Sequence, residues 1–184
     1  MASPNTSLAE VLRLQGLDTM RSIGAVTAAA VAKSNSMIAA RLNNEAVLQA
    51  MIDRAQGQMW VIKDFDKLRD TVVGSGKCPG IVQSHGGLPL VKFWFEGPKV
   101  RGTPAIPYGT AVATFVEGKY PNWESGNHVA IYIDQDPVKG VLVFDQWTGQ
   151  PAGYRWMKYK DEAGIVDRSN NGSALSIILT RKAQ

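Results

Sequence analysis

The sequence changes character about a third of the way along the chain, and this change limits the fold more than any other feature. Residues 1–72 carry apolar side chains at helical spacing, whereas residues 88–180 consist of short β-like runs separated by glycine and proline. These runs are Leu88–Phe95, Gly109–Val116, His128–Ile133, Gly140–Phe144, Tyr154–Tyr159 and Ala174–Leu179. Helices followed by an antiparallel meander are typical of an α+β fold. We therefore expect N-terminal helices packed on an antiparallel β-sheet.

The first third predicts more than one helix. Gly16 and Gly24 interrupt the first apolar face, a second helix is expected over Ser36–Gln56, and Gly57 would end it. Later in the chain, Asp136-Pro137 and Lys139-Gly140 separate two β-like runs as the turn of a hairpin would.

Composition and charge exclude several classes of protein. The chain has 184 residues, of which 45% are hydrophobic, and Cys78 is the only cysteine, so no disulfide scaffold can form. The net charge of +4 is spread along the chain, without a basic and aromatic cluster, and we expect no nucleic-acid partner. No apolar run comes close to the roughly 20 residues that cross a bilayer, so no membrane partner is expected.

The segment Ser22–Ala32 has the length of a signal-peptide core. It consists mostly of alanine, glycine and threonine, and the residues before it include Glu10 and Asp18, which do not fit the usual charged-then-apolar pattern. We interpret it as a helix face of small residues that packs closely on another element.

Cys78 lies in a setting that can activate a thiol. It follows a glycine-rich turn, Gly74-Ser75-Gly76, and precedes Pro79, a residue favoured at the first position of a helix. We expect Cys78 to cap a helix over Pro79–Ser84, where the helix dipole and Lys77 would lower its pKa. A buried structural cysteine is the alternative interpretation.

A cysteine nucleophile needs a base, and the chain has two histidines. His85 would lie two helical turns from Cys78, about 10 Å along the axis, which is too far for direct proton transfer. His128 opens the predicted strand His128–Ile133, where a side chain is held rigidly and stays accessible. We therefore favour His128 as the base.

The histidine needs an acceptor for its second ring nitrogen. The strand that follows ends in Asp145-Gln146-Trp147, and its side chains alternate between two faces. Asp145 is the preferred partner of His128, and Gln146 on the opposite face is the alternative. Five aromatic residues could line a substrate groove or pack in the core: Trp94, Tyr120, Trp123, Trp147 and Trp156.

Other chemistries lack their sequence patterns. The two histidines and the cysteine have no short metal-ligand spacing, and we expect neither a metal nor a cofactor. The chain contains no P-loop, no dinucleotide fingerprint and no G-x-S-x-G elbow.

The order of these residues carries a family resemblance. A cysteine at a helix start, a histidine at a strand start and a polar residue on the next strand resemble the papain-like cell-wall amidases, including the CHAP domains. The blocks Gly109–Phe115, Gly118–Pro121, Gly126–Tyr132 and Asp145–Trp147 look more specifically like the second family of type VI secretion amidase effectors. The likeness covers roughly residues 70–158.

This resemblance implies an antibacterial toxin that is made in the cytoplasm and delivered by a type VI secretion apparatus to the periplasm of a target Gram-negative cell. It implies cleavage of peptidoglycan peptides, at the D-Ala–mDAP cross-link, and a cognate immunity protein. Carried over, Cys78 is the nucleophile, His128 the base and Asp145 the orienting residue. We expect Trp123, Asn127, Gln146 and Trp147 to contact substrate.

On this interpretation residues 1–184 form one catalytic domain, with a helical extension over 1–60 and the amidase core over 70–184. Pro79-Gly80 departs from the family pattern, which has a bulkier, helix-forming pair after the cysteine. Two alternatives stay open. One is a degenerate amidase fold that binds wall fragments or a secretion partner, and the other is a phage or housekeeping wall hydrolase.

Overall fold

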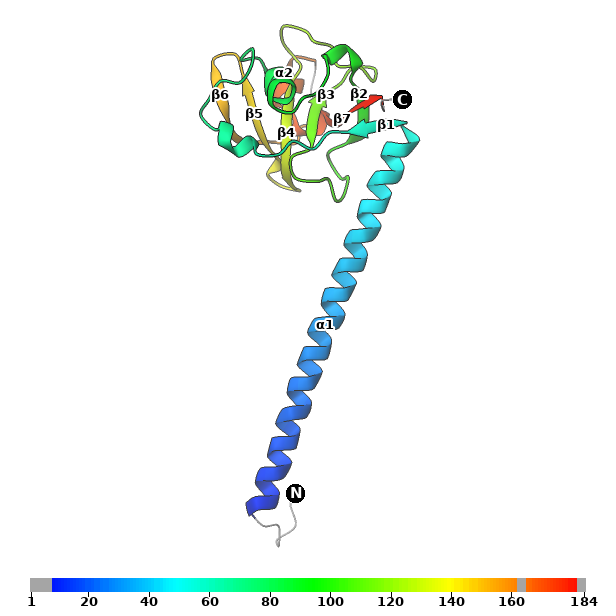
Figure 1. Ribbon diagram of the computed structural model, residues 1–184, viewed down its shortest axis with the longest axis vertical. Helices are drawn as coiled ribbons and strands as arrows, with labels where there is room; N and C mark the ends of the chain where they lie inside the picture. Colours follow the sequence, from blue (N-terminus) through cyan, green and yellow to red (C-terminus); the bar gives the residue numbers. More distant parts are fainter. Residues whose placement is uncertain (1–7, 162–164, 182–184) are drawn as a thin grey trace. The chain divides into compact units, whose positions relative to one another are not determined.

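The computed structural model describes residues 8–161 and 165–181 (Figure 1). The chain divides into two compact units, Met1–Asn43 and Asn44–Gln184. The second unit contains the whole β-sheet and both clusters of buried apolar residues. The unit that carries the sheet therefore begins at Asn44, ahead of the boundary that we expected near residues 60–70.

The N-terminal helix α1 (Leu8–Arg54) is one continuous element, which corrects the expectation of separate helices. It runs through Gly16 and Gly24 and ends at Arg54, ahead of Gly57. A glycine inside a helix costs about 1 kcal/mol relative to alanine. The alanines around Gly24 are the best helix formers, and no proline interrupts the helix.

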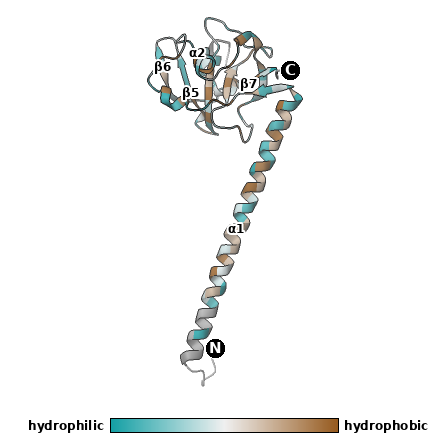
Figure 2. Ribbon diagram, viewed as in Figure 1, coloured by the Kyte–Doolittle hydropathy of each residue, from teal (hydrophilic) through white to brown (hydrophobic). Residues whose placement is uncertain are grey.

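The described part of α1 is apolar without being amphipathic. Figure 2 shows hydrophobic and hydrophilic residues mixed along it rather than gathered in one stripe. Side chains from Asp18 to Asn43 are exposed, including Met20, Ile23 and Val26, so the close packing that we expected of Ser22–Ala32 is not observed. By length and composition alone, Asp18–Arg54 is able to cross a membrane, a criterion that signal sequences and some core helices also meet. We expected no segment of this kind, because polar residues break up each apolar run. The helix is nevertheless apolar on average over its length.

The second unit is built on a seven-stranded sheet in which all the pairs are antiparallel. Its strands are β1 (Gly57–Met59), β2 (Phe95–Lys99), β3 (Ala111–Thr114), β4 (Val129–Asp136), β5 (Gly140–Trp147), β6 (Gln150–Met157) and β7 (Leu175–Arg181). The order across the sheet is β1-β7-β3-β4-β5-β6, and β2 also pairs with β7. The predicted hairpin turn is confirmed, because Asp136 pairs with Gly140 across β4 and β5.

The sheet separates two groups of buried side chains. Val129, Ile131 and Phe144 belong to one cluster, with Ile81 and Val82 of the segment after Cys78. Ala130, Tyr132, Val141 and Val143 belong to the other cluster, together with Leu48 and Ile52 near the end of α1. Successive strand residues point to opposite faces, so the helix that begins at Cys78 packs on the Phe144 face.

The short elements depart most from expectation. The predicted strand Leu88–Phe95 is instead a 3₁₀ turn, Val91–Phe93, followed by β2, and Pro89 lacks the N–H that a strand ladder needs. Helix α2 covers only Cys78–Gly80, and a single π-helical turn, Ile81–His85, continues it. The other short helices are 3₁₀ turns, at Phe65–Leu68, Ile165–Asn170 and Gly172–Ala174.

Candidate active site

Cys78 is the first residue of α2, and a tightly folded loop precedes it. Gly74 and Gly76 have φ values of 58° and 72°, which side chains rarely adopt, so the loop depends on glycine at both positions. Lys77 has extended backbone angles and is the N-cap of α2. Pro79 sits in the first turn, where a helix has no use for its missing N–H.

The residue after Pro79 explains the departure from the family pattern. A Cβ atom on Gly80 would lie 2.8 Å from the Val73 carbonyl oxygen, closer than real Cβ contacts. The loop therefore approaches α2 so closely that only glycine fits there.

His128 and Asp145 form a buried pair, and the His128 ring is hydrogen-bonded to Cys78 at the start of α2. His128 Nε2 lies 2.5 Å from Asp145 Oδ2, and the two side chains are 4% and 1% exposed. The His128 amide also donates to Thr114 Oγ1 at 2.8 Å, which fixes the start of β4. Because Nε2 faces the carboxylate, Nδ1 is the ring nitrogen left for the thiol.

Arg155 on β6 contacts the same carboxylate. Its Nε and Nη2 atoms both lie 2.8 Å from Asp145 Oδ2, and Nη2 is 3.2 Å from His128 Nε2. Arg155 Nη1 donates to Asn170 Oδ1 at 2.8 Å, and the guanidinium lies over the Trp147 ring, 5.0 Å from its centroid. Asp145 thus accepts hydrogen bonds from both His128 and Arg155 although solvent barely reaches it.

A second chain of contacts reaches Cys78 from the other side. The Tyr120 hydroxyl lies 3.7 Å from Cys78 Sγ, and Asn127 Nδ2 donates to that hydroxyl at 3.2 Å. Burial and the charge of Cys78 raise the pKa of Tyr120. Tyr120 therefore stays protonated, and its O–H is able to donate a hydrogen bond to the Cys78 thiolate.

The two reacting groups have pKa values displaced toward an ion pair. Burial favours the neutral Cys78 thiol, but the hydrogen bond and the charge of His128 outweigh it and lower the Cys78 pKa. Burial also disfavours a charged His128, but hydrogen bonds to Asp145 and Cys78 raise its pKa on balance. Together these shifts favour a thiolate–imidazolium pair, the reactive form of a cysteine nucleophile.

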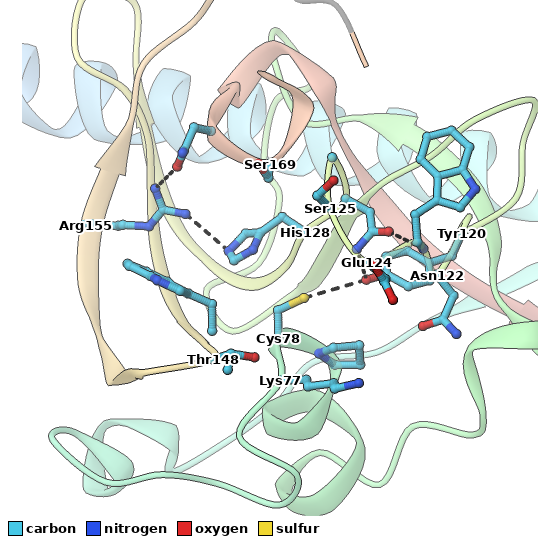
Figure 3. A pocket seen from close by; sticks show the side chains of 16 residues that line it. Lys77, Cys78, Tyr120, Asn122, Glu124, Ser125, His128, Thr148, Arg155 and Ser169 are labelled. Atoms are coloured by element: carbon cyan, nitrogen blue, oxygen red, sulfur yellow. Dashed lines mark hydrogen bonds between the residues drawn. The ribbon is translucent and has the colours of Figure 1, made fainter. Parts of the chain in front are cut away.

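These groups open into one pocket of about 620 Å³. In Figure 3 the sulfur of Cys78 points into it, between His128 and Tyr120. Of the residues that we expected to contact substrate, Trp123, Asn127 and Trp147 line the pocket. Gln146 does not, because it is fully buried on the Phe144 face and bonded to the loop before Cys78.

The other histidine stands apart from this site. His85 is exposed at the end of the π-helical turn, and its Nε2 lies 2.8 Å from the Lys63 carbonyl oxygen. Among the residues described, no group of three histidine, cysteine or acidic side chains is placed to hold a metal ion.

Arg155 and Asn170 are the site residues that sequence reasoning missed. Arg155 lies in the predicted strand Tyr154–Tyr159, and nothing next to it in the sequence singled it out. The signal becomes visible once β5 and β6 are paired as a hairpin, because Gly153 faces Asp145 and Arg155 is then the diagonal neighbour of the carboxylate. No comparable signal exists for Asn170, which reaches the site through the 3₁₀ turn Ile165–Asn170.

Comparisons with known proteins agree with this geometry. The family model for domesticated amidase effector 2 matches residues 51–178. A type VI secretion amidase effector 2 protein from Salmonella typhi is 32% identical over 131 residues, which cover 65% of this chain and 98% of that protein.

A solved structure of a type 6 secretion amidase effector 2 (Tae2) is also similar. It superposes with a TM-score of 0.59 at 30% identity, over 68% of this chain and 97% of that one. The match supports the α+β, papain-like fold that we expected from the order of cysteine, histidine and aspartate. This chain belongs to the amidase effector 2 family.

Proposed function

We propose that this protein is a peptidoglycan amidase, a cysteine endopeptidase that acts as an antibacterial effector of type VI secretion. The observation that carries the proposal is that Cys78 and His128 line one pocket, with Asp145 bonded to His128 behind it, in a chain of the amidase effector 2 family. The names of the relatives, an amidase effector in each case, support the reaction class and the route of delivery.

The proposed reaction begins with the thiolate–imidazolium pair. The Cys78 thiolate attacks the amide carbonyl carbon, and the electron pair of the C=O bond moves to oxygen. The Cys78 N–H, which has no acceptor inside its own helix, donates to this oxyanion together with a second donor. His128 then gives its proton to the leaving amine, and the C–N bond breaks.

A thioester between Cys78 and the acyl group remains. His128, neutral after the first step, removes a proton from water, which attacks the thioester and releases a carboxylate. Asp145 keeps Nε2 bound throughout, so that Nδ1 faces the sulfur in both steps.

The proposed substrate is the D-Ala–mDAP cross-link between peptidoglycan stem peptides, reached in the periplasm of a target Gram-negative cell. The proposed partners are the type VI secretion apparatus, which exports the protein, and a cognate immunity protein, which protects the producing cell. The pocket of about 620 Å³ is bordered by Trp123 and Trp147, which are both 42% exposed and offer apolar surface to a peptide.

The test is digestion of purified Gram-negative sacculi by the wild-type protein and by Cys78→Ala, with the fragments identified by mass spectrometry. We expect loss of cross-linked dimers with the wild type alone, which also names the scissile bond. Full activity of Cys78→Ala would refute the cysteine mechanism. Absence of fragments from a folded wild-type protein would favour a wall-binding protein instead.

A further inference from the structure

Gln146 is the one buried amide that connects the sheet to the loop before Cys78 within the part of the chain that the structure describes. It is fully buried, next to Asp145 on β5 but on the opposite face. Its Oε1 accepts from the Val73 amide at 2.9 Å, and its Nε2 donates to the Val73 carbonyl at 2.7 Å. The same Nε2 donates to the Lys77 carbonyl at 3.0 Å. One side chain therefore uses three hydrogen bonds to hold both ends of the loop.

The contact with Lys77 matters because of the peptide bond that follows it. The Lys77 carbonyl and the Cys78 N–H belong to one planar peptide unit and point in opposite directions. The Gly80 amide also donates to the Lys77 carbonyl, at 2.9 Å. With the carbonyl held from two sides, the plane cannot rotate, and the direction of the Cys78 N–H is fixed.

We propose that Gln146 is a positioning residue that orients the Cys78 N–H toward the oxyanion by holding the Lys77–Cys78 peptide plane. The inference rests on the proposed amidase function and adds a residue to it. Gln146 does not line the pocket, and its three hydrogen bonds all go to backbone atoms, through which it acts.

The packing around Gly80 supports this role independently. A Cβ atom there would lie 3.2 Å from Gln146 Nε2, as well as 2.8 Å from the Val73 oxygen. The close approach of α2 to the Gln146 amide thus requires glycine at position 80. The Pro79-Gly80 pair is then a fitted part of the site rather than a sign of lost catalysis.

The test compares two reactions of the same thiol. Hydrolysis of soluble cross-linked muropeptide dimers needs the oxyanion donor. Alkylation by iodoacetamide does not, because the sulfur displaces iodide at a saturated carbon and no oxyanion forms. The variant is Gln146→Met, which keeps the length of the side chain and removes its three hydrogen bonds. Folding is checked by circular dichroism, and the uncharged variant Gln146→Leu replaces Gln146→Met if the latter does not fold.

Gln135→Met is the matched control. Gln135 also holds a loop to the sheet, with Nε2 donating to the Thr103 carbonyl at 2.8 Å and Oε1 accepting from the Gly102 amide at 3.2 Å. It lies seven residues along β4 from His128, about 23 Å at the rise of a strand.

We expect Gln146→Met to lower kcat by at least about tenfold with KM nearly unchanged. The loss should not exceed the roughly 10²–10³-fold that removal of an oxyanion donor costs. Its alkylation rate should stay within about threefold of the wild type, and Gln135→Met should match the wild type in both reactions.

Three results would overturn the inference. They are an unchanged kcat in Gln146→Met, a parallel loss of hydrolysis and alkylation, and an equal loss of hydrolysis in Gln135→Met. A wild-type protein that is alkylated but releases no fragments would overturn the proposed function as well, which separates the two failures.

Discussion

Replacing Asp145 with asparagine isolates the charge of the carboxylate from its size. Asparagine keeps the volume and one carbonyl oxygen, so His128 and Arg155 retain an acceptor, but the imidazolium loses its anionic partner. The carboxylate oxygen lies 2.5 Å from His128 Nε2 and Asp145 is 1% exposed, so water cannot replace the lost charge. A hydrogen bond to a charged group contributes about 1.5–3 kcal/mol net.

At about 1.4 kcal/mol per factor of ten, this corresponds to a loss of roughly 10- to 150-fold in kcat/KM. The assay is release of monomers from soluble muropeptide dimers, with the alkylation rate of Cys78 measured beside it. Both should fall in Asp145→Asn, because a less basic His128 forms less thiolate. Asp134→Asn on β4 is the control, since Asp134 is exposed and bonds only locally to the Gln135 amide.

A folded Asp145→Asn protein that keeps more than a third of the wild-type kcat/KM would refute the reasoning. So would a normal alkylation rate beside slow hydrolysis, because that result would remove Asp145 from the activation of the thiol.

Three further predictions follow from the same geometry. The thiolate–imidazolium pair exists between the lowered pKa of Cys78 and the raised pKa of His128. Alkylation of Cys78 should therefore persist well below pH 9.0. In His128→Ala the midpoint of the alkylation profile should move back toward pH 9.0. Hydrolysis should decline only above pH 6.5, where an ordinary histidine is already half deprotonated. Arg155→Lys keeps the charge but not the forked contact with Asp145, and we expect a loss of about fivefold in kcat/KM, equal to roughly 1 kcal/mol. A protein that begins at residue 44 should fold and hydrolyse dimers within about twofold of the full chain, by circular dichroism and the same assay, because both core clusters lie within residues 44–184.

The sheet and the face that each strand residue occupies could be predicted from local pattern. All six β-like runs overlap observed strands, although Leu88–Phe95 does so only at Phe95, because alternation and turn residues are encoded within a few positions. The same alternation separated Asp145 from Gln146 before any partner was known. Local pattern failed for α1, where we gave Gly16 and Gly24 more weight than the alanines that keep the helix continuous.

The contacts that complete the site depend on register and on distant segments. Arg155 reaches Asp145 only in the observed pairing of β5 with β6. Gln146 bonds to a loop 73 residues earlier in the chain, and nothing near it in the sequence marks that loop as its partner. We expected Gln146 to contact substrate, but it does not line the pocket. Its polar atoms are instead hydrogen-bonded to the backbone of the loop before Cys78.

Asp145 and Gln146 together show how a single strand keeps nucleophile and base aligned. Two adjacent residues of one strand must point to opposite sides. Asp145 therefore reaches His128 and Gln146 reaches the Cys78 loop from a single segment of backbone. A shift of β5 by one residue would exchange the two side chains, placing a carboxylate against the Val73 and Lys77 carbonyls and an amide against His128. Both contacts would fail at once, so the register of β5 determines the alignment of the whole site.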